Sequence, residues 1–148
     1  MRSERTLLDS EHYRITASSP GPVLVITRKP RAFSTKAEVD EACDPVQALL
    51  DNAGRARHRI VVDSRRAVGR NDPDYETWFA HHRRRMVLGF QRAALVVATP
   101  VGMLHVQRLL RQDATADTVR VFTELEDAMQ YAESTAPISA RVEAAAKK

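Results

Sequence analysis

Apolar positions near the N-terminus follow two different periods. In residues 12–18 every second residue is apolar, which predicts a half-buried strand, and residues 23–29 predict a second strand. A Pro-Gly-Pro turn separates the two strands, so a hairpin is favoured. The clear alternation of the first strand is typical of an edge position. Residues 32–54 then change to helical spacing and open with a capping box, in which Thr35 reaches towards Glu38.

Short apolar strands and amphipathic helices alternate along the rest of the chain. They are a strand at 59–63, a helix at about 72–88, a strand at 93–99, a helix capped by Thr99, a strand at 118–122 and a helix with a Thr123–Glu126 capping box. Apolar strands without alternation are covered on both faces, and their order demands right-handed crossovers. The sequence therefore predicts a small α/β sandwich in the order β-β-α-β-α-β-α-β-α. Its sheet is mixed and mostly parallel, with about five strands and about four helices.

Composition is consistent with one domain. The 148 residues divide into an N-terminal extension at 1–10, a domain at 11–134 and a flexible C-terminal tail at 135–148. The single cysteine, Cys43, excludes an internal disulfide and a cysteine-based zinc cluster. No stretch resembles a secretory signal or approaches the ~20 apolar residues of a membrane-spanning helix. We therefore expect a cytoplasmic protein.

Positive charge is concentrated in the middle of the chain. Between Arg55 and Arg92 there are ten arginines and four acidic residues, a local balance of +6 in a chain whose net charge is +4. A basic face of this kind can meet nucleic acid, anionic lipid or an acidic protein. A solvated arginine-rich surface explains the same composition.

Three segments carry a resemblance to a known family. They are RIVVDSRRAVG at 59–69, AALVVATPVGMLHVQRLL at 93–110 and VRVFTELEDAMQYA at 119–132. With the order of elements over about 11–134, they resemble the STAS domains, the SpoIIAA-like anti-sigma-factor antagonists and their relatives. The resemblance implies a non-enzymatic bacterial signalling module that docks onto a kinase-like, anti-sigma-like or other signalling protein. In the phosphoregulated members, phosphate on a serine or threonine at the start of the second helix blocks docking.

The position of that phosphoacceptor falls at or next to Asn71, Asp72 and Pro73, where this sequence has no hydroxyl. The nearest hydroxyls are Ser64 at the strand exit and Thr77 inside the helix. Switching by phosphorylation in the manner of the family is therefore not expected. The same residues make a good helix start, because Asn71 or Asp72 can cap free N–H groups and proline suits the first turn.

The resemblance places the docking surface on the loop and second helix, from Asp63 to Arg85. The arginines of the loop favour an acidic partner or a phosphate, and Trp78 is either a core anchor or an interface hot spot. The expected partner-binding residues are Asp63, Ser64, Arg65, Arg66, Arg70, Asn71, Asp72, Trp78, Arg84 and Arg85. No cofactor is expected, and the oligomeric state stays open, a homodimer included.

Other chemistries have less support in the sequence. The alternative is binding of nucleic acid or of an anionic ligand through the arginine-rich face at 55–92, but no base-stacking strand or helix-turn-helix pattern accompanies it. No G-x-S-x-G, P-loop or G-x-G-x-x-G motif is present, so we expect no enzyme. Adjacent histidines in HHRRR at 81–85 point in different directions, so no metal site is predicted. A hydrophobic ligand is a further alternative, but the apolar strands give no sign of an unfilled pocket.

Overall fold

The computed structural model describes residues 3–19, 22–67, 73–112 and 118–138. In chain order the elements are β1 (Ser3–Asp9), β2 (Tyr13–Ser19), β3 (Val23–Arg28), α1 (Lys36–Ala53), the 3-10 turn η1 (Arg55–Arg57), β4 (Arg59–Asp63), α2 (Pro73–Val87), β5 (Ala93–Val96), α3 (Pro100–Gln112), β6 (Val119–Phe122) and α4 (Leu125–Glu133). No helix in these ranges is both long and apolar enough to cross a membrane.

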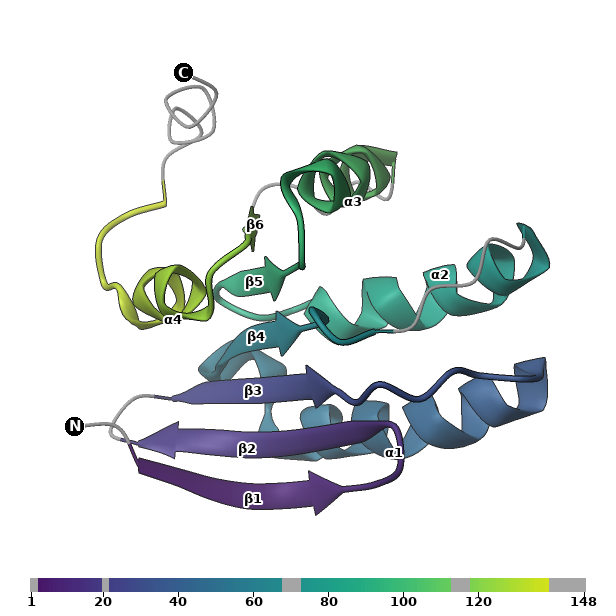
Figure 1. Ribbon diagram of the computed structural model, residues 1–148. Coiled ribbons are helices and arrows are strands. Elements are labelled where there is room, and N and C mark those ends of the chain that lie inside the picture. Colours follow the sequence, from purple (N-terminus) through teal and green to yellow (C-terminus); the bar gives the residue numbers. More distant parts are fainter. Residues whose placement is uncertain (1–2, 20–21, 68–72, 113–117, 139–148) are drawn as a thin grey trace.

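The six strands form one mixed sheet in sequential order, β1 to β6 (Figure 1). The pairs β1–β2 and β2–β3 are antiparallel, and the three pairs from β3 to β6 are parallel. The predicted hairpin, the mixed and mostly parallel sheet and the four α-helices are all present in the described part of the chain. The predicted α/β sandwich is confirmed.

Two expectations about the N-terminus are wrong. Residues 3–9, expected as part of an extension, form β1, so the sheet has six strands and β2 lies between β1 and β3 rather than at the edge. β1 is mostly polar and exposed, with only Leu7 and Leu8 packed against the core. Its pairing register also shifts between Thr6 and Leu8, which interrupts any alternation along the strand. The alternation in β2 separates Tyr13 and Ile15, which lie in the main core, from the polar residues Arg14, Thr16 and Ser18 on the other face, of which only Arg14 is exposed. Such alternation is not restricted to edge strands.

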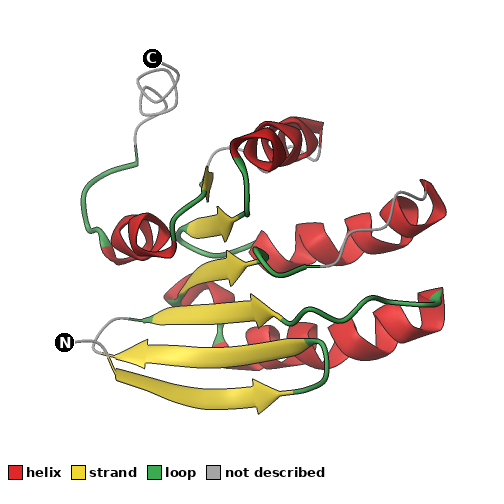
Figure 2. Cartoon of the chain, viewed as in Figure 1, coloured by secondary structure: helices red, strands yellow, loops and turns green. Residues whose placement is uncertain are grey.

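The helices cover the two faces of the sheet unequally. Because β3 to β6 follow in sequence and parallel crossovers are right-handed, α1, α2 and α3 all lie on one face, while α4 covers the other (Figure 2). Side chains of β4 alternate between the two cores. Ile60 and Val62 belong to the main core with the first three helices, and Val61 belongs to the core under α4. A strand buried on both faces explains its continuous apolar sequence.

Local signals set most helix ends. The Thr35 hydroxyl accepts a hydrogen bond from the Glu38 amide at 3.1 Å, which confirms the predicted cap of α1. At the start of α3, Thr99 accepts from the amide of Gly102 at 3.0 Å. The predicted Thr123 cap is wrong, because α4 begins one residue later, after Glu124, and no side chain caps it.

Candidate functional site

The exit of β4 is built around an ion pair between Asp63 and Arg65. The Arg65 side chain donates from Nε to Asp63 Oδ1 at 2.9 Å and from Nη2 to Oδ2 at 2.8 Å, and its backbone amide donates to Oδ1 at 3.2 Å. Burial acts to raise the pKa of Asp63, but the hydrogen bonds and charge of Arg65 outweigh it and lower that pKa. The same hydrogen bonds raise the pKa of Arg65. The pair holds a charged, exposed guanidinium in a fixed position.

The neighbouring predicted residues have different environments. Ser64 donates from both its backbone amide and its hydroxyl to the carbonyl of Val96, each at 2.9 Å, and so fastens the end of β4 to β5. Arg66 is exposed beside it. The predicted site residues Arg70, Asn71 and Asp72 lie outside the described residues. The structure thus brings Asp63, Ser64, Arg65 and Arg66 together at the exit of β4.

Predicted residues on α2 extend away from that loop. Trp78 is half-buried and packs against the main core. Arg84 and Arg85 lie in the last turn of α2, and Arg84 is exposed. At 1.5 Å per residue, the eleven steps from Pro73 to Arg84 span roughly 16 Å along the helix axis. Arg85 lies 3.9 Å from Asp51 of α1. The predicted residues therefore form an elongated surface and not one cluster.

Among the described residues between 55 and 92, several arginines donate to other groups of the same chain. Arg55 donates to Asp51, Gln47 and the carbonyls of Arg85 and Leu88; Arg59 to the carbonyls of Ala132 and Ser134; Arg65 to Asp63; and Arg92 to the carbonyls of Tyr131 and Ala136. Guanidinium groups used in this way offer fewer donors to an external phosphate. The described arginines of the basic stretch therefore do not all face solvent.

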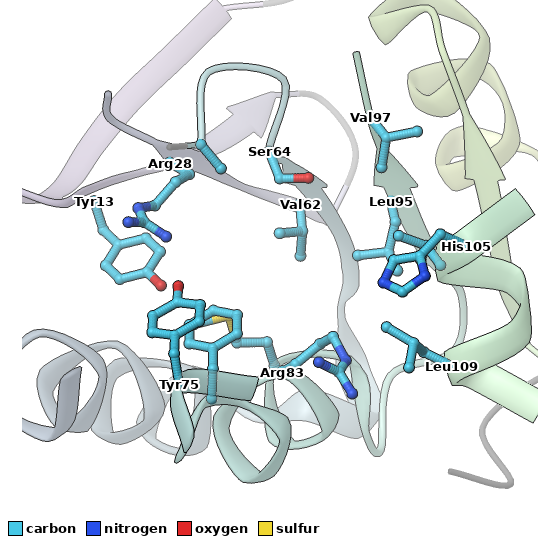
Figure 3. A pocket seen from close by; sticks show the side chains of 14 residues that line it. Tyr13, Arg28, Val62, Ser64, Tyr75, Arg83, Leu95, Val97, His105 and Leu109 are labelled. Carbon is cyan, nitrogen blue, oxygen red and sulfur yellow. The ribbon is translucent and has the colours of Figure 1, made fainter. Parts of the chain in front are cut away.

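A cavity opens beside the predicted site, between the sheet, α2 and α3 (Figure 3). Its volume is about 240 Å³. The lining residues are Tyr13, Arg28, Val62, Ser64, Ala67, Tyr75, Phe79, Arg83, Met86, Leu95, Val97, His105, Val106 and Leu109. The apolar strands carry no sign of this cavity in the sequence, because it forms where α3 packs loosely. Its only fully buried residue is Leu110, near its C-terminal end.

Arg28 is a functional candidate that the sequence did not reveal. It ends β3, is only 4% exposed and lines the cavity. Its Nη2 donates to the carbonyl of Arg31 at 2.8 Å, and its guanidinium lies over the rings of Phe33 and Tyr13, at 4.3 and 5.6 Å from their centroids. In the sequence, the sign of this residue is an arginine at the end of an apolar strand. The neighbouring residues in the chain do not indicate that α2 and α3 leave a cavity beside it.

Two titratable groups near Arg28 are held in their neutral forms. Burial raises the pKa of Tyr13 well above its usual value, and burial raises the pKa of Cys43 to about 11. The Tyr13 hydroxyl and the Cys43 sulfur are 3.7 Å apart. At neutral pH Tyr13 therefore keeps its proton, and Cys43 lacks the thiolate character of a nucleophile.

No grouping of three histidine, cysteine, aspartate or glutamate side chains suited to a metal occurs among the described residues. His82, one of two adjacent histidines in α2, instead pairs with Asp40 of α1, with 2.8 Å between Nε2 and Oδ1. The comparisons with known proteins add no relatives: no family model, curated protein or solved structure matches this chain.

Proposed function

We propose that this protein is a non-enzymatic, cytoplasmic regulatory module of bacterial signalling that docks onto an acidic partner protein through the surface from Asp63 to Arg85. The observation that carries the proposal is a continuous exposed stripe along α2. Asp74, Thr77, His81 and Arg84 are exposed at spacings of three and four residues, so they share one side of the helix. The exposed Leu88 follows at the same spacing.

The stripe and the loop together have the dimensions of an interface. A partner that covers about 800 Å² per side easily spans the roughly 16 Å between the start and end of α2. Asp63 orients Arg65 by a two-point ion pair, so less side-chain entropy is lost when a partner carboxylate binds the remaining N–H groups. The order of elements, which resembles the STAS domains, supports the same assignment.

The alternative of nucleic-acid binding has weaker support. Arg55, Arg59 and Arg92 donate to carbonyl groups inside the molecule. Phosphate binding depends on the number of available cations, and it weakens steeply with salt. The outward arginines Arg66 and Arg84 are more suited to a few defined contacts with protein carboxylates.

The test is an affinity capture from native lysate with nuclease, in which wild type is compared with an Arg66→Glu/Arg84→Glu double variant. We expect a protein that wild type retains after nuclease treatment and that the double variant loses. Arg57→Glu is the matched control, because Arg57 is also exposed but precedes β4, at the other end of that strand. Recovery of nucleic acid alone, or equal capture by all three proteins, would contradict the proposal.

A further inference from the structure

The cavity between the sheet, α2 and α3 has walls suited to a hydrocarbon. Val62 and Leu95 come from the sheet, Met86 from α2, and Val106 and Leu109 from α3. A dry apolar cavity of about 150 Å³ can hold benzene, so about 240 Å³ has room for a body of roughly eight to ten carbon atoms. Ala67 and His105 are exposed, and they mark the side where the cavity meets solvent.

One end of this cavity carries a buried positive charge without a counter-charge. Within the described ranges no carboxylate forms an ion pair with Arg28, and its Nε has no hydrogen-bond partner. Stacking on Phe33 and Tyr13 offsets part of the desolvation cost. Buried charges are nevertheless usually paired, because an isolated charge in an apolar environment is strongly unfavourable. An anion in the cavity would supply the missing partner.

The other polar groups of the cavity also favour an anion. None of its described lining residues is acidic, whereas Arg83 and His105 add basic groups. Figure 3 shows Arg28 and Tyr13 at one side of the cavity, with Arg83, His105 and Leu109 towards the other. The Tyr13 hydroxyl, 3.7 Å from the Cys43 sulfur, stays protonated beside the guanidinium because burial raises its pKa, so it adds no negative charge to the cavity.

We propose that this cavity binds a small amphipathic carboxylate, with its carboxylate on Arg28 and its apolar body between Met86, Leu95 and Leu109. The planar guanidinium matches a carboxylate in two-point geometry. This inference does not rest on the docking surface. Arg28 lies outside the arginine-rich stretch, and the ligand would be enclosed by the sheet, α2 and α3 rather than bound on the exposed side of α2.

The first test compares three probes with the same eight-carbon chain by calorimetry and by amide chemical shifts: octanoate, 1-octanol and octylamine. We expect octanoate to bind about 10- to 100-fold more tightly than octanol, the range for a charge-assisted hydrogen bond, and octylamine not to bind. Equal binding of octanoate and octanol would show an apolar hole without anion recognition. No binding at millimolar concentrations would leave Arg28 as a stacking residue only. Either result overturns the proposal.

Variants then locate the two ends of the ligand. Arg28→Met keeps an apolar side chain, and we expect it to reduce octanoate binding to the level of octanol while octanol binding stays unchanged. Leu109→Trp fills the cavity and should abolish binding of octanoate and of octanol. Its matched control is Leu104→Trp on the same helix, because the native Leu104 side chain is 61% exposed. The control variant should still bind octanoate and octanol.

Thermal unfolding of each variant shows whether it is folded. If Arg28→Met does not fold, the three probes on wild type and the Leu109→Trp and Leu104→Trp pair still decide the question. A folded Arg28→Met that keeps the wild-type preference for octanoate would overturn the proposal, as would a Leu109→Trp variant that binds octanoate normally.

Discussion

At the scale of single residues, the arginines of this protein have three different roles. Arg65 is a surface cation oriented by Asp63, with 38% of its side chain exposed. Arg59 and Arg92 are structural, because they donate to carbonyls at the end of α4. Arg28 is buried beside a cavity. The amino-acid composition does not distinguish these roles. Exposed arginines can contribute to a docking surface, whereas a buried arginine without a counter-charge indicates an internal ligand.

The Asp63–Arg65 pair makes stability depend on pH. The folded-state pKa of Asp63 is lowered relative to its unfolded-state pKa, which is near 3.9. The ion pair therefore contributes fully to the free energy of unfolding above the unfolded-state pKa. This contribution is lost as the pH falls through the lower folded-state pKa. We expect Arg65→Ala to reduce the free energy of unfolding by about 1 kcal/mol at neutral pH, a modest value because Arg65 is partly exposed. The difference should shrink as the pH falls from neutral into the acidic range below about 3.9.

Urea unfolding at neutral and acidic pH measures this difference. Arg66→Ala is the control, since Arg66 is exposed in the same loop, and its effect should stay within about 0.5 kcal/mol. A loss for Arg65→Ala that is the same at both pH values would contradict the ion-pair explanation.

Among the secondary-structure elements, α4 has its last carbonyl groups hydrogen-bonded by arginine side chains that come from the sheet and its adjoining loop. Arg59 Nη1 donates to the carbonyl of Ala132 at 2.7 Å and to that of Ser134 at 2.6 Å. Arg92 donates to the carbonyl of Tyr131 at 3.0 Å. These carbonyls carry the negative end of the helix dipole, which cations stabilise. A nine-residue helix is too short to be stable alone, so these contacts and the core beneath it hold it in place.

Removal of the Arg59 guanidinium should therefore loosen α4 specifically. We expect Arg59→Met to lower the free energy of unfolding by about 1–3 kcal/mol and to accelerate amide hydrogen exchange in residues 125–134. Exchange in α1 should change less. Arg57→Met, a change to an exposed arginine in the adjacent turn, serves as the control and should leave both measurements unchanged. Equal acceleration throughout the chain would instead indicate a general loss of stability.

At the scale of the whole molecule, the sequential strand order determines where a cavity can form. Three crossover helices must share one face of the sheet, and α3 is the least buried of them. The cavity lies where α3 meets α2 above β4 and β5. The opposite face has only α4 to cover it, so the first two strands keep polar residues such as Arg14 and Thr6 there. The N-terminal strand completes the sheet beyond the hairpin.

Because β1 covers the edge of β2, its deletion should have two effects. A chain that lacks residues 1–9 should unfold at lower urea concentration, and it should also associate, because the newly exposed edge of β2 offers unpaired N–H and C=O groups. Size-exclusion chromatography with light scattering measures the second effect.

Leu8→Ser separates the two effects, since it removes an apolar contact and keeps the strand pairing. It should lower the urea midpoint without promoting association. If the deletion variant keeps the size and midpoint of the full chain, β1 does not contribute to the sheet in solution.

The order of elements from β2 onwards, the α/β class and the caps at Thr35 and Thr99 follow from the amino-acid sequence alone, because they depend on hydrophobic period and on contacts within a few residues. The sequence also identified the exit of β4, where Asp63 and Arg65 are close in the chain. The pairing of β1 with β2, the contacts of Arg59 and Arg92 with α4, and the place of Arg28 beside a cavity depend on the packed fold. Each of these depends on segments far apart in the chain, whose mutual packing leaves no local periodic signal.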